Sequence, residues 1–87
     1  MKVYRFTAQA RIAIEDAGLT QTEIAQAAGI DRHHFNKRLN GGGVMPATAN
    51  RIARAFADAT KTDKQEAMRL LFEEFDDERE AKRKQNA

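Results

Sequence analysis

The strongest constraint on the fold is a pair of helix-start signals on either side of a helix-stop signal in residues 19–43. Thr20 and Glu23 have the spacing of a capping box, in which the two residues satisfy each other's backbone N–H groups. Gly29 offers the positive φ that ends many helices, and Asp31 follows as the N-cap of a second helix. Because the connection is only about three residues long, the two helices must meet at a sharp angle. The sequence therefore predicts a helix-turn-helix unit.

Apolar side chains at helical spacing indicate how this unit is held together. Phe35 and Leu39 are four residues apart, so they share one face of the second helix. Leu19 with Ile24, and Ile30 with Phe35, have the spacing of hydrophobic staples. The residues predicted to pack in the core of the unit are Leu19, Ile24, Ala25, Ala28, Ile30, Phe35 and Leu39.

The opposite face of the second helix carries guanidinium, imidazole, amide and ammonium groups and no apolar side chain. These groups belong to Arg32, His33, Asn36, Lys37 and Asn40. No acidic residue lies between Arg32 and Leu39. Side chains of this kind read base edges and phosphates in a major groove, so this face is predicted to contact nucleic acid.

Three further helices are predicted around the unit. The first covers residues 8–17, with Thr7 as its cap and Gly18 as its stop. The next opens at Pro46, a favoured first helical residue. Its buried stripe is predicted to contain Ala49, Ile52, Ala53, Phe56 and Ala59. Residues 1–6 are too short to classify, and either an extended arm or an edge strand is compatible with them.

A fifth helix is predicted to start at a second capping box, formed by Thr62 and Gln65. Its apolar seam contains Met68, Leu71, Phe72 and Phe75, and it continues into a charged tail. The seam can close the core of the chain, contact a second copy, or do both. The candidate dimerisation or partner residues are Leu70, Leu71, Phe72 and Phe75. The expected fold is thus all-α, compact and five-helical, with a DNA-binding helix-turn-helix domain at 1–61, its helix-turn-helix at 20–40, and the fifth, C-terminal helix at 62–87.

Composition limits the class of protein. The 87 residues suffice for one domain, and the absence of cysteine excludes disulfides and fits a reducing compartment. No apolar run approaches the roughly 18 residues that span a bilayer, and residues 1–6 lack the apolar core of a signal peptide. Residues 1–56 hold eight basic and four acidic residues, whereas residues 57–87 hold seven basic and nine acidic ones. We therefore expect a cytoplasmic protein whose basic N-terminal part faces a polyanion.

Residues 19–56 resemble the helix-turn-helix domain of the Cro and lambda-repressor (Xre) family. The matching residues are Leu19-Thr20-Gln21, Ile24-Ala25, Gly29-Ile30, Leu39-Asn40-Gly41, Pro46 and Ile52-Ala53. The resemblance implies a compact five-helix fold and a nucleoid-associated transcriptional regulator from a bacterium, phage or plasmid. Arg38 and Leu39 depart from the family pattern, in which many relatives have an apolar residue and an acid there. We expect Leu39 to pack in the core and Arg38 to lie along the surface.

The resemblance also implies which residues touch DNA. The positions of the family's base-contacting residues are occupied by Arg32, His33, Asn36 and Lys37. The glutamine that opens the first helix of the unit holds a phosphate in that family, and Gln21 occupies this position. The predicted contacts to the DNA backbone are Thr20, Gln21, Arg38, Asn40 and Gly42. We expect a homodimer that represses transcription by binding double-stranded DNA at a palindromic operator.

A competing hypothesis is an antitoxin-type module, in which the C-terminal helix binds a partner protein and the helix-turn-helix autoregulates. A toxin-like reading frame beside the gene, or a co-purifying polypeptide, would distinguish the two. An enzyme is not expected, because no nucleophile with a base and no phosphate-binding glycine motif is present. His33 and His34 are adjacent on a helix and point about 100° apart, which is poor geometry for a shared metal. We expect no catalytic residue, metal or cofactor.

Overall fold

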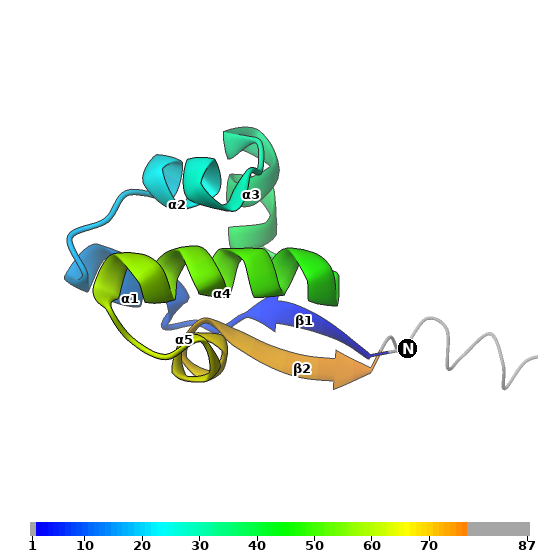
Figure 1. Cartoon of the computed structure of the whole chain (residues 1–87). Coiled ribbons are helices and arrows are strands. Elements are labelled where there is room, and N and C mark those ends of the chain that lie inside the picture. The colour runs from blue at the N-terminus through cyan, green and yellow to red at the C-terminus, as the bar shows by residue number, and fades with distance from the viewer. Residues whose placement is uncertain (1, 77–87) are drawn as a thin grey trace, which may run out of the picture.

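The computed structural model describes the backbone of residues 2–76 and the side chains of residues 3–74. In this part of the chain there are five α-helices and two β-strands (Figure 1). They follow in the order β1 (Lys2–Phe6), α1 (Ala10–Asp16), α2 (Gln21–Ala28), α3 (Arg32–Leu39), α4 (Pro46–Thr60), α5 (Lys64–Leu71) and β2 (Phe72–Asp76). The predicted charged tail, 77–87, lies outside the described residues.

The longest helix, α4, forms the centre of the molecule. Figure 1 shows α2 and α3 on one side of α4, and α5 with the strands on the other. The predicted stripe of α4 is buried at Ala49, Ile52, Ala53 and Phe56, but Ala59 is exposed, so that part of the prediction is wrong. The largest fully buried side chains come from every helix and from the loop before α4: Phe35, Ile14, Ile24, Ile52, Leu71 and Val44. One core therefore holds the helix-turn-helix against the rest of the chain.

The two ends of the described chain form an antiparallel sheet, which makes the fold mostly helical rather than all-α. β1 pairs with β2 in a register that sets Tyr4 opposite Glu74, and Phe6 opposite Phe72. The predicted fifth helix consequently ends at Leu71, and the stretch predicted to continue it is a strand. Of the two possibilities left open for residues 1–6, the structure has the strand.

Aromatic packing explains why the chain leaves the helix at Phe72. The ring of Phe72 lies 4.6 Å from that of Phe6 and 6.3 Å from that of Tyr4, measured between ring centroids. An extended backbone places Phe72 on the same face of the sheet as both partners, because side chains alternate along a strand. Phe72 is thereby buried, and this packing outweighs continuation of the helical seam.

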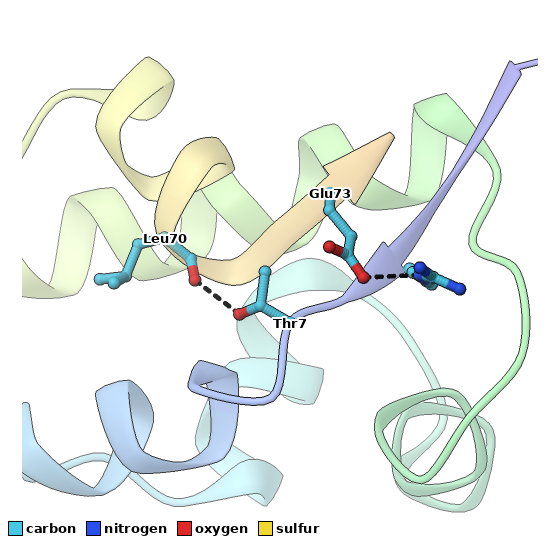
Figure 2. A network of polar contacts seen from close by, with 4 residues as sticks. Thr7, Leu70 and Glu73 are labelled. Atoms are coloured by element: carbon cyan, nitrogen blue, oxygen red, sulfur yellow. Dashed lines mark hydrogen bonds and ion pairs between the residues drawn. The ribbon is translucent and has the colours of Figure 1, made fainter. Parts of the chain in front are cut away.

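Two predicted helix caps are replaced by other contacts. The Thr7 hydroxyl donates to the Leu70 carbonyl oxygen at 2.9 Å, as Figure 2 shows, and the first helix begins three residues later, at Ala10. Thr7 thus ties the end of β1 to the end of α5 instead of capping α1. Helix α5 follows Asp63 rather than Thr62, whose hydroxyl shares a 2.8 Å hydrogen bond with the Thr60 hydroxyl.

Polar pairs cover the two faces of the sheet. The Arg5 guanidinium forms a 2.6 Å ion pair with Glu73, the carboxylate labelled in Figure 2. On the other face the Tyr4 hydroxyl donates to Glu74 Oε1 at 3.1 Å. This hydrogen bond to the carboxylate, aided by desolvation and by the charge of Glu74, raises the pKa of Tyr4 above its usual value.

The raised pKa of Tyr4 can be measured directly, since Tyr4 is the single tyrosine of a chain without tryptophan. Because the pKa of Tyr4 is raised in the folded state, protonated Tyr4 stabilises the fold below about pH 10. This stabilisation is lost as the pH rises through the raised pKa. We expect ultraviolet titration of the phenol to show that Glu74→Ala lowers the pKa of Tyr4 toward its usual value. Glu73→Ala, on the opposite face, serves as the control and should leave the pKa of Tyr4 unchanged. Equal pKa values in the wild type and Glu74→Ala would contradict the assigned cause.

Candidate nucleic-acid interface

The turn between α2 and α3 has the predicted local structure. Thr20 and Glu23 form the complete capping box at the start of α2. Gly29 ends that helix at φ 71°, where a glycine carries no steric cost. Asp31 then caps α3 by accepting the backbone N–H of His34 at 3.4 Å. The angle between the two helices is therefore set by local contacts on both sides of the turn.

Long-range contacts hold α3 at its inner face and at its C-terminal end. Phe35 is 1% exposed, and its ring meets that of Phe6 edge to face at 5.6 Å. Leu39 packs half-buried against the core, as predicted. After α3, Val44 and Tyr4 exchange two backbone hydrogen bonds of 2.6 and 2.9 Å. Strand β1 therefore lies between β2 and the loop that follows α3, and it anchors that loop.

The predicted base-contacting residues lie together on the exposed side of α3. Arg32, His33, Asn36 and Lys37 are all exposed. Within the described part of the chain, no hydrogen bond or ion pair occupies the side chains of Arg32, His33 or Lys37. The helix carries no acid, so its cationic groups are not neutralised within their own element. Such a face can approach a polyanion without first breaking internal salt bridges.

The residues predicted to contact the DNA backbone lie in two parts of the structure. Thr20 and Gln21 lie at the start of α2, where the Thr20 hydroxyl accepts the Glu23 N–H at 3.1 Å and Gln21 is half-buried. Arg38 in the last turn of α3 and Gly42 in the loop after it lie together: a Cβ added to Gly42 would come within 3.6 Å of Arg38 Nη1. Gly42 also has a φ of 108°, which other residues rarely adopt.

Asn40 belongs to a chain of side-chain contacts that sequence reasoning missed. Arg11 Nη2 on α1 donates to Asn40 Oδ1 at 2.6 Å. Asn40 Nδ2 in turn donates to Asn36 Oδ1 at 3.1 Å. Arg11 was not among the predicted site residues, and no local pattern could indicate it, since it is 29 positions away from Asn40. The structure therefore adds one basic residue to the candidate interface and links it to a predicted base-reading amide.

The candidate dimerisation residues have different environments. Leu71 and Phe72 are 0% and 4% exposed and belong to the core of the chain, so they are not surface residues available to a partner. Leu70, by contrast, is 41% exposed. The side chain of Phe75 lies outside the described residues. Of the two uses left open for the apolar seam, the structure has core closure at Leu71 and Phe72.

Among residues 3–74, no three metal-binding side chains are grouped closely enough to hold an ion. None of the helices in the described chain is sufficiently long and apolar to traverse a bilayer. Comparison with protein-family models, with curated proteins and with solved structures gave no match to this chain.

Proposed function

We propose that the protein is a sequence-specific double-stranded DNA-binding transcriptional regulator that reads a major groove with α3. The observation that carries the proposal is the acid-free face of α3, where Arg32, His33 and Lys37 are exposed and have no internal partner in the described chain. Guanidinium and ammonium groups pair with guanine O6 and N7, and an amide offers both a donor and an acceptor to base edges. The core contacts of Phe35 hold this face outward.

The simplest assembly is a homodimer on a two-fold symmetric operator. Two copies of α3 would then enter major grooves separated by one helical turn, about 34 Å. Gln21, Arg38 and Gly42 would contact phosphates and set the register of the helix. Leu70, exposed on α5, is the best-placed of the candidate dimerisation residues for a contact between copies. Blocking a promoter is the simplest output for a protein of this size, so repression is favoured over activation.

The proposal is tested by removing one charge at a time from α3. Arg32→Ala and Lys37→Ala should each weaken binding to a duplex selected from a random pool by about 1–3 kcal/mol and relax base preference. Arg69→Ala removes the same charge from α5, on the far side of α4, and serves as the matched control. Titrations on the selected duplex and on a scrambled duplex measure the effect. Unchanged affinity of both α3 variants for the selected duplex would refute the proposal.

The antitoxin alternative has less support from the packing. That hypothesis assigned an apolar seam of the C-terminal helix to a partner protein, but Leu71 and Phe72 of that seam are buried within the chain. Within the described side chains, a partner that bound α5 would have to use Leu70 and its neighbours, or unfold the end of that helix.

A further inference from the structure

The hydrogen-bond chain from Arg11 through Asn40 to Asn36 has a fixed polarity. A guanidinium group carries only donors, so the Asn40 atom that faces Arg11 at 2.6 Å must be the carbonyl oxygen Oδ1. The other end of the Asn40 amide, Nδ2, is then a donor, so the Asn36 atom that it meets at 3.1 Å must be Oδ1 as well. The donor-only character of Arg11 thus decides the orientation of two amides.

Local geometry supports this hydrogen-bond relay of Arg11, Asn40 and Asn36. Asn40 follows the last residue of α3 and keeps a helical backbone, at φ −83° and ψ −4°, so it lies one turn beyond Asn36 on the same face. Its backbone N–H also donates to the Asn36 carbonyl oxygen at 3.1 Å. Arg11 comes from α1, a different element, and reaches Asn40 from outside the helix-turn-helix. The relay therefore connects the first helix to the reading face.

We infer that Arg11 is a positioning residue that determines which base atoms Asn36 reads. The inference rests on the proposed function, because it concerns the DNA-reading face of α3. The Asn40 contact engages one of the two lone pairs of Asn36 Oδ1 and fixes the direction of that amide, whereas both donors of Nδ2 stay free to face a base. Bidentate pairing with adenine requires an acceptor as well as a donor, whereas guanine presents two acceptors, N7 and O6. The relay accordingly biases Asn36 toward guanine and against cytosine, whose major-groove edge is a donor.

The first test uses the free protein and does not depend on DNA. Arg11→Met keeps the length of the side chain and removes its donors, whereas Arg11→Lys keeps a cationic donor. Nitrogen-15 spectra of the asparagine side-chain amides should show Asn40 and Asn36 signals that shift in Arg11→Met and are largely retained in Arg11→Lys. Arg69→Met, on α5, is the control and should leave both signals in place. Unchanged Asn36 and Asn40 signals in Arg11→Met would overturn the relay.

The second test measures base preference by sequencing duplexes bound from a random pool. At one position per half-site, the wild type should favour guanine, and Arg11→Met should lose at least about fivefold of that preference, which corresponds to the low end of one base-specific contact. Base preferences at the other positions should persist in Arg11→Met. Arg11→Lys should retain the guanine preference that Arg11→Met loses. An equal loss at all positions would instead assign Arg11 to a phosphate contact and overturn the positioning role. A wild type without any sequence preference would overturn the proposed function itself. The nitrogen-15 spectra would still show whether Arg11, Asn40 and Asn36 are joined by hydrogen bonds.

Discussion

Replacing Phe35 by alanine is expected to cost about 3–5 kcal/mol of folding free energy, the largest loss for any single change on α3. The side chain is 1% exposed, so truncation removes its transfer energy and leaves a cavity. It also removes the edge-to-face contact with Phe6, a type of pair worth about 0.5–1.5 kcal/mol beyond buried area. Small domains are stable by only about 5–15 kcal/mol, so the variant should lose a large part of the total stability of the fold. Urea denaturation followed by circular dichroism measures the loss.

Two control variants are compared with Phe35→Ala. Phe35→Leu retains most of the apolar volume and should cost clearly less. Ile12→Ala truncates a side chain that is 57% exposed on α1 and should change stability by less than about 0.5 kcal/mol. If Phe35→Ala were as mild as Ile12→Ala, α3 could not be held by the core in the way described, and its polar face would lack a fixed direction.

The helix-turn-helix was predictable because its determinants are local. The Thr20–Glu23 capping box, the left-handed Gly29 and the Asp31 cap each act within three or four residues, and all three are present in the structure. The exposure of Arg32 and Lys37 follows from helical spacing alone, because Phe35 is the residue of α3 that faces the core.

The sheet was not predictable in the same way, because its determinants are remote in sequence. Leu71, Phe72 and Phe75 fit a helical seam, and the segment Phe72–Asp76 shows no regular alternation of apolar and polar residues. Only the rings of Tyr4 and Phe6, more than 60 positions earlier, make the extended form of Phe72 favourable. The Arg11–Asn40 contact was missed for the same reason. Local signals thus located α3 and its exposed polar face, and tertiary packing decided what lies around them.

The acidic side chains of β2 disfavour pairing between the β2 strands of two copies. β2 is the outer strand of the two-stranded sheet, and its exposed side chains Glu73 and Glu74 are both acidic. Pairing β2 with the same strand of a second copy would bring like charges close together, which is unfavourable. A dimer of this chain is therefore expected to avoid β2-to-β2 pairing. The exposed surface of α5 around Leu70 is the favoured alternative for a contact between copies.

The adjacent residues Leu70 and Leu71 separate core packing from surface contact. Leu71→Ala should cost about 2–5 kcal/mol of folding free energy, because Leu71 is 0% exposed between the helices and the sheet. Leu70→Ala should change the stability of the isolated chain by less than about 0.5 kcal/mol, because its side chain is 41% exposed. Urea denaturation at low protein concentration compares the two variants under the same conditions.

The same pair also tests the proposed contact between two copies. If Leu70 contributes to the dimer, Leu70→Ala should weaken self-association in sedimentation equilibrium and make operator binding more dependent on protein concentration, since binding two half-sites requires the dimer. Gln65→Ala, exposed on another face of α5, is a control for general changes to that helix. Equal stability losses in Leu70→Ala and Leu71→Ala would mean that α5 is rotated about its axis relative to the described packing. Unchanged association in Leu70→Ala would place the dimer contact on another surface, while the core role of Leu71 would stand on the denaturation data alone.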